Sequence, residues 1–191
     1  MDYKKIYKLA YDYMDNSIID GDCGELCNYH CCRDFDSDGE KLGIYLMPYE
    51  YESMLRNSRF LEGVKVEKHS SKDYFISKKI KFLHYIFCGV ESKCLREYRP
   101  IQCRTYPFEP HLEDDTLSLV VEKDQVHDCP LLSDTSKWRE EFVRGIYMGW
   151  KELITIPKVY EFVVYESRRR VLERNISLIL SDFSNDFIKR L

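Results

Sequence analysis

The segment CGELCNYHCC, residues 23–32, places four cysteines within ten residues at the spacing C-x3-C-x3-C-C. Four more cysteines follow, and the full set is Cys23, Cys27, Cys31, Cys32, Cys88, Cys94, Cys103 and Cys129. Thiolates are soft ligands that suit zinc and iron–sulfur clusters. In an extended backbone the adjacent Cys31 and Cys32 point apart, so they serve two centres, or one of them binds metal while the other packs. The segment predicts a domain organised around a metal site.

The first residues, MDYKKIYKLAYDYMDNS, are rich in charge and tyrosine and lack the apolar core of a signal peptide. We therefore expect a cytoplasmic protein, in which thiols stay reduced. Clustered thiols in a reducing compartment favour metal binding. Disulfides remain the alternative, because an even number of cysteines also fits a covalent framework.

The composition argues against several classes of protein. A chain of 191 residues is long enough for one domain with a helical appendage. Its net charge of −4 argues against a general nucleic-acid binder, which usually has a basic excess. No apolar run approaches the roughly 18 residues of a membrane span. With 8 glycines and no Gly-rich loop that opens a helix, a dinucleotide-binding fold is not expected.

Apolar periodicity predicts both helices and strands. Three- and four-residue steps between Tyr3 and Met14 predict a first helix. Strands are expected in GIYLM, VKVEKHS, YFISKKIKFLHYIFC and DTLSLVVEKD. A helix should follow GIYLM, with Pro48 at its first position and with Glu50 and Glu52 in the first turn, where the helix dipole favours anions.

The remainder of the chain is expected to be helical. Trp138, Phe142, Ile146 and Trp150 form an apolar stripe at four-residue steps that ends before Pro157. Apolar residues further along the chain, among them Ile179, Phe183 and Phe187, predict more helix. We predict a small, irregular α+β metal-binding domain whose short strands pack on N- and C-terminal helices. Residues 1–134 would form the cysteine-cluster domain, and residues 135–191 a helical extension packed on it.

The segment CGVESKCLREYRPIQCRTYPF, residues 88–108, contains three of the cysteines. Arg99 and Arg104 lie near Cys103 and can offset the negative charge of thiolate ligands, although surface exposure is an equal alternative. Pro100 and Pro107 favour an extended ligand loop. Two aromatic residues, Tyr106 and Phe108, are interpreted as packing that keeps water from the site.

Weaker patterns have simpler explanations. His30 and His127 lie close to cysteines and could replace a thiolate, whereas His69, His84 and His111 are expected on the surface or in the core. Asp34, Asp36, Asp38 and Gly39 match the start of an EF-hand loop, but its twelfth position is Tyr45 instead of glutamate, which favours a solvated loop. Arg168, Arg169 and Arg170 favour a solvated helix face, because Glu166 and Glu173 flank them.

The residues from 20 to 132 resemble the YkgJ-type cysteine-cluster family, which is described as a zinc- or iron-chelating domain. The resemblance rests on the first cysteine segment, on GIYLMPYEYE, on CLREYRPIQCRTYPF and on a final CP. It implies that all eight cysteines chelate metal, although C-x3-C here replaces the usual C-x2-C of the opening. Flagellin lysine N-methylases are similar in their cysteine set, more distantly.

These observations predict a protein that binds an iron–sulfur cluster or zinc through its clustered cysteines. It could act as a metal-stabilised interaction module without catalysis. Alternatively it is a metal-dependent enzyme, either redox or S-adenosylmethionine-linked and protein-modifying, or a thiol–disulfide protein. No residue pattern identifies a catalytic group, a substrate or a partner.

Overall fold

A computed structural model of the protein describes residues 1–29, 43–56, 64–74, 76–87, 96, 99–124 and 129–180. The helices are α1 (Tyr3–Tyr13), α2 (Ile101–Thr105), α3 (Glu140–Leu153) and α4 (Pro157–Glu173), with short helices η1 (Cys23–Leu26), η3 (Tyr51–Leu55), η6 (Pro130–Leu132) and η7 (Thr135–Lys137). The strands are β1 (Gly43–Tyr45), β2 (Val66–Ser70), β3 (Phe82–Phe87), β4 (Glu109–Glu113), β5 (Thr116–Val121) and β6 (Leu178–Leu180). This mixture confirms the predicted α+β fold with helices towards both ends of the chain.

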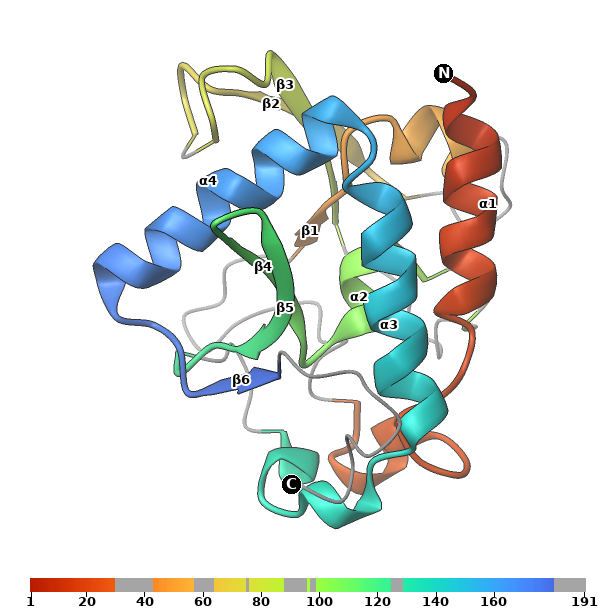
Figure 1. Cartoon of the computed structure of the whole chain (residues 1–191). Helices are drawn as coiled ribbons and strands as arrows, with labels where there is room; N and C mark the ends of the chain where they lie inside the picture. Colours follow the sequence, from red (N-terminus) through yellow and green to blue (C-terminus); the bar gives the residue numbers. More distant parts are fainter. Residues whose placement is uncertain are drawn as a thin grey trace.

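The strands form two small antiparallel sheets. One has the order β1-β3-β2, in which Tyr45 pairs with Tyr85 and Glu67 also pairs with Tyr85. The other has the order β4-β5-β6, in which Leu119 pairs with Leu180. Helix α4 lies against β4, whereas α1 and α3 run side by side on the other side of the molecule (Figure 1). None of the described helices is long and apolar enough to cross a membrane.

Close contact between α1 and α3 depends on two glycines of α3. A Cβ atom at Gly145 would lie 2.2 Å from the backbone oxygen of Tyr13, at the end of α1. A Cβ atom at Gly149 would instead meet the flexible side chain of Met14 at 2.6 Å. The glycines therefore let α1 approach until Met14 and Trp150 are both fully buried.

Replacing Gly145 with alanine should destabilise the fold although alanine favours helices. Overpacking typically costs about 1–3 kcal/mol, against about 1 kcal/mol gained in helix propensity. Because the obstacle is backbone, we expect a net loss of about 1–2 kcal/mol in the free energy of unfolding, measured by urea denaturation. Gly149→Ala is the matched comparison and should cost less, because its nearest backbone atom, the Ala10 carbonyl oxygen, lies 3.1 Å from the new Cβ and the closer contacts are with the Met14 side chain. Equal stability of Gly145→Ala and the unmodified protein would contradict this account of the helix contact.

A buried carboxyl group joins three segments at the centre of the fold. Glu50 is completely buried, and its Oε1 accepts hydrogen bonds from the Tyr11 hydroxyl and the Ile101 backbone N–H, both at 2.7 Å. Its Oε2 accepts from the Met47 N–H at 2.8 Å. Burial raises the pKa of Glu50, while these hydrogen bonds and the charge of Arg104 oppose the rise. Glu50 thus links α1 to the first turn of α2, a role different from the dipole contact that the sequence predicts.

Two sequence predictions about secondary structure are wrong. Ile179 lies in strand β6 and not in a helix, because residues 178–180 pair with β5. Cys103 lies on helix α2 and not in an extended loop: Pro100 is the residue before that helix, and Pro107 follows its end. Phe183 and Phe187 lie outside the described residues.

Candidate metal centre

Cys23 and Cys27 are positioned by a short helical turn. The Asp22 carboxylate accepts a hydrogen bond from the Gly24 N–H at 3.0 Å and caps η1. The turn then closes on the Gly24 carbonyl, which accepts from the N–H groups of Cys27 (3.3 Å) and Tyr29 (2.8 Å). A Cβ atom at Gly24 would lie 2.2 Å from the Tyr29 ring, so only glycine leaves room for this closure. Both thiols are half-buried and neither is in a disulfide.

Cys129 lies far from η1 in the sequence but at the same end of the molecule (Figure 1). It precedes η6, and its carbonyl accepts from the Leu132 N–H at 3.0 Å. The segment that follows is tied to the residues before η1: the Arg139 N–H donates to the Ile18 carbonyl at 2.9 Å, and the Arg139 guanidinium pairs with Asp20 at 3.2 Å. Figure 1 shows the segments around η1 and η6 together at one end of the molecule.

These three thiols interact electrostatically with one another. Burial is the main cause of a raised pKa at Cys23, and negative charge on Cys129 and Cys27 would raise it further. Burial likewise raises the pKa of Cys129, an effect to which Cys27 adds and which the N–H groups of Leu131 and Leu132 oppose. Thiols from distant parts of the sequence thus act electrostatically on one another.

Of the remaining predicted ligands, only Cys103 lies in the part of the chain that the structure describes. Cys103 is half-buried on α2. Cys31, Cys32, Cys88 and Cys94, together with His30, His127 and the EF-hand-like residues 34–39, lie outside the described residues. Within the part of the chain that is described, no three Cys, His, Asp or Glu side chains form a group that could hold a metal ion.

Arg99 acts electrostatically on Cys23, and Arg104 supports the backbone of Arg99. The positive charge of Arg99 opposes the rise in the pKa of Cys23, as expected of a residue that offsets thiolate charge. Arg104 is buried, and its Nε donates to the Arg99 carbonyl at 2.7 Å while its Nη1 pairs with Asp15 at 3.2 Å. Surface exposure, the alternative for Arg104, is therefore wrong. Arg104 supports the Arg99 backbone instead of facing solvent.

Arg96, which the sequence did not single out, also interacts electrostatically with Cys23. Its guanidinium donates to the carbonyls of Met14 (2.7 Å) and Asp15 (2.6 Å) just after α1. Burial lowers the pKa of Arg96 to about 10, and Arg104 and Arg99 contribute to the shift, whereas Asp15 and Cys23 oppose it. The spacing of Arg96, Arg99 and Arg104 in LREYRPIQCR was the available signal, since charges at such steps can gather on one side of a chain.

Aromatic packing encloses this end of the fold. Phe108 is completely buried, and its ring meets Trp138 edge to face with 4.9 Å between the centroids. The Trp138 Nε1–H donates to the Leu131 carbonyl at 2.8 Å, which fixes η6 next to Cys129. The interpretation of Phe108 as packing is confirmed.

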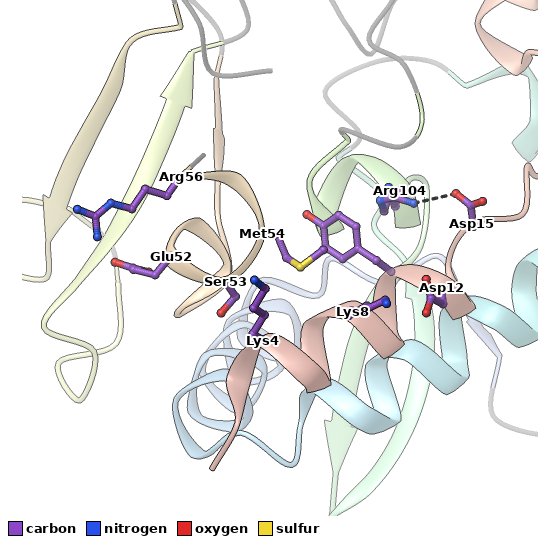
Figure 2. Close-up of a pocket in the computed structure, with 10 residues that line it drawn as sticks. Lys4, Lys8, Asp12, Asp15, Glu52, Ser53, Met54, Arg56 and Arg104 are labelled. Carbon is purple, nitrogen blue, oxygen red and sulfur yellow. Dashed lines mark hydrogen bonds and ion pairs between the residues drawn. The ribbon is translucent and has the colours of Figure 1, made fainter. Parts of the chain in front are cut away.

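A cavity of about 530 Å³ opens between α1 and η3 (Figure 2). Its lining mixes charges of both signs, among them Lys4, Lys8, Asp12, Asp15, Glu52 and Arg104. The Arg104–Asp15 ion pair closes one end (Figure 2). Because no cysteine is among its described lining residues, this cavity is separate from the thiol cluster.

No protein-family model, no curated protein and no solved structure matches the chain.

Proposed function

We propose that the protein chelates zinc or an iron–sulfur cluster through its clustered cysteines, as the resemblance to the YkgJ-type family implies. The observation that carries the proposal is the electrostatic interaction of Cys23 and Cys27 with Cys129, three free and half-buried thiols. Reduced thiols that are close together and half-buried are the donor set that soft metals prefer. With Cys31, Cys32, Cys88 and Cys94, the chain supplies enough thiols for a four-cysteine site.

Positive charge next to the thiols supports the same proposal. Four thiolates on a divalent ion leave a net charge of about −2, which is costly where it is partly buried. Arg99 and Arg96 both interact electrostatically with Cys23 and would offset part of this charge. A cytoplasmic location agrees with reduced thiols, and the net charge of −4 makes nucleic acid an improbable partner.

The test is anaerobic purification followed by metal analysis and an absorption spectrum. We expect either zinc near one equivalent or more, or iron with sulfide and a charge-transfer band in visible light. Cys23→Ser and Cys129→Ser should each lower the metal-to-protein ratio at least by half, because each removes one ligand from the centre. Ser136→Ala, an exposed change in the same segment as Cys129, is the control. A folded, colourless protein without metal would refute the proposal.

Thiol–disulfide exchange is the second candidate, and it is favoured by the free, half-buried thiols of Cys23 and Cys129, which interact electrostatically. It predicts reversible formation of a disulfide in metal-free protein, detected by mass spectrometry after oxidation with glutathione disulfide. A metal-dependent enzyme, by contrast, needs a ligand position that is open to substrate, whereas an interaction module encloses its metal. The rate at which a chelator removes the bound metal separates these two roles: removal should be fast from an open site and slow from an enclosed one.

A further inference from the structure

A second cavity, of about 490 Å³, lies where the β1-β3-β2 sheet faces α4 and the β4-β5 hairpin. Its volume is within the range of pockets that bind small molecules. Tyr45 of β1, Leu83 of β3 and Ile76 line it from one side, and Phe162 of α4 lines it from the other. The remaining described lining is almost entirely charged. This cavity is not part of the thiol cluster, because its described lining contains no cysteine.

Carboxylates outnumber guanidinium groups around this cavity. The four acidic lining residues are Glu109, Glu122, Glu166 and Glu173, and the two basic ones are Arg169 and Arg170. If all six are ionised, these groups leave an excess of two negative charges (four minus two). A cavity with such an excess attracts cations and repels anions.

Neither arginine is available to bind an anion. Arg170 is buried, and its guanidinium contacts Glu122, the Pro110 carbonyl (2.9 Å) and Glu109 (3.4 Å). The guanidinium of Arg169 pairs with Glu166 at 2.9 Å and with Glu173 at 2.6 Å. All the positive charge of the described lining is thus already matched, and the excess charge belongs to the carboxylates.

The hydroxyl group of Tyr45 is also arranged to accept hydrogen bonds. Oε2 of Glu67 lies 3.1 Å from Nε2 of His69, and Nδ1 of His69 lies 3.0 Å from the Tyr45 hydroxyl. The pKa of Glu67 is lowered by its hydrogen bonds to Lys65 and His69, so its carboxylate can only accept. In the tautomer that donates to Glu67, the proton lies on Nε2, and Tyr45 donates to Nδ1. The lone pairs of the hydroxyl oxygen then remain as hydrogen-bond acceptors.

The ring of His69 is held rigidly in this chain of hydrogen bonds. It stacks on Tyr74 with 3.7 Å between the centroids and on Tyr85 with 4.8 Å. Burial raises the pKa of Tyr45, and the charge of Glu166, on the opposite wall, raises it further, so the phenol stays neutral. A neutral aromatic ring with an acceptor oxygen, next to carboxylates, suits a cation through both hydrogen bonds and its π face.

We propose that this cavity binds a small organic cation, an amidinium or ammonium group on an apolar stem. The charged group would lie between the carboxylates and Tyr45, and the stem against Ile76, Leu83 and Phe162. A metal ion fits less well, since no group of three ligating side chains forms among the described residues. An inorganic ion would also make no contact with the apolar side chains of Ile76, Leu83 and Phe162.

Glu109 makes the binding sensitive to pH. Burial raises its pKa to about 7, with Glu122 and Glu166 raising it further and with Arg170 and Arg169 opposing them. A cation favours the ionised carboxylate, so its affinity should rise with pH, by up to about tenfold between pH 6 and pH 8. His111 is also near Arg170, and burial lowers its pKa, which favours the neutral imidazole.

Three probes of nearly the same shape but different charge test the proposal: benzamidinium, benzamide and benzoate. Methyl NMR spectra at pH 8 should show saturable shifts at Ile76 and Leu83 with benzamidinium, with a dissociation constant of about 1 mM. Benzamide should bind at least fivefold more weakly, and benzoate should not saturate. Shifts that are equal for benzoate and benzamidinium, or absent with benzamidinium at pH 8, would overturn the proposal.

Variants locate the site and test the role of charge. Glu109→Gln should weaken benzamidinium binding about tenfold and abolish its dependence on pH. Glu113→Gln, an exposed change on the same strand, should leave both unchanged. Glu166→Gln gives a second test on α4 if Glu109→Gln fails to fold. Binding of undiminished affinity in the folded variant of either wall residue would refute the assignment.

Discussion

Glu50→Ala should lower the free energy of unfolding by about 3–5 kcal/mol, because three buried donors lose their common acceptor. The Tyr11 hydroxyl and the N–H groups of Met47 and Ile101 all bond to this carboxylate. Leaving a buried donor unsatisfied costs about 1–3 kcal/mol. Denaturation in urea, followed by circular dichroism, measures the loss.

Two further variants make this prediction specific to the hydrogen bonds of Glu50. Glu50→Gln keeps an acceptor oxygen for Tyr11 and Ile101 but turns an amide donor towards the Met47 N–H, so about half of the loss should remain. Glu52→Ala, a change at a side chain that is 47% exposed, should cost no more than about 0.5 kcal/mol. Similar losses for Glu50→Ala and Glu52→Ala would show that the buried acceptor contributes little.

The effect of Glu50 should extend to the proposed metal centre. Its Oε1 bonds to the first N–H of α2, the helix that contains Cys103 and Arg104. Arg104 in turn donates to the carbonyl of Arg99, whose charge acts on Cys23. The segment that supplies positive charge to the thiols is therefore positioned from the core by a residue that binds no metal itself.

Local patterns predict the helices because their information lies within one segment. The stripe of Phe142, Ile146 and Trp150 is buried along α3, and α1 begins at Tyr3. The strand from Thr116 to Val121 is also within the predicted segment DTLSLVVEKD. In each case the repeat of apolar residues is long enough to identify both the element and its buried face.

Elements that depend on distant partners could not be predicted in this way. Strand β4 contains Pro110, which argues against a strand in sequence but is tolerated at the edge of the β4-β5-β6 sheet. The three residues of β6 become a strand only because Val121 and its neighbours offer an unpaired edge. Arg96 and the cation cavity were missed for the same reason, since tertiary structure alone brings their partners together.

The thiols are predictable in part from local sequence and in part only from the fold. Residue type and spacing predict metal ligands without knowledge of the fold, because few other roles require so many thiols in a reduced protein. The electrostatic interaction of Cys23 with Cys129, by contrast, requires the fold to pair the segments before η1 and after η6, which Arg139 joins through Ile18 and Asp20. Sequence could therefore indicate the chemistry of the site but not its surroundings.

Arg170→Met should lower the free energy of unfolding by about 3 kcal/mol, because it leaves the partly buried carboxylates of Glu109 and Glu122 without their counter-charge. The flanking glutamates predict a solvated helix face for Arg170, and this prediction is wrong. Arg170 is only 2% exposed, and its partners are Glu122, Glu109 and the Pro110 carbonyl. Breaking a buried pair by removing one partner costs far more than losing a surface pair. Thermal and urea denaturation of the variant measure the loss.

The neighbouring arginine provides a matched control for this prediction. Arg169 belongs to the same helix and also pairs with glutamates, but its side chain is 36% exposed, so Arg169→Met should cost about 0–1 kcal/mol. Adding Glu109→Gln to Arg170→Met should restore part of the stability, because it removes one of the unpaired charges. Stability should also recover as the pH falls below 7 in the single variant, since protonation of Glu109 has the same effect as the second substitution. Equal losses for the two arginine variants, without rescue by Glu109→Gln or by acid, would mean that packing of the Arg170 stem, and not its charge, stabilises the contact between α4 and β4.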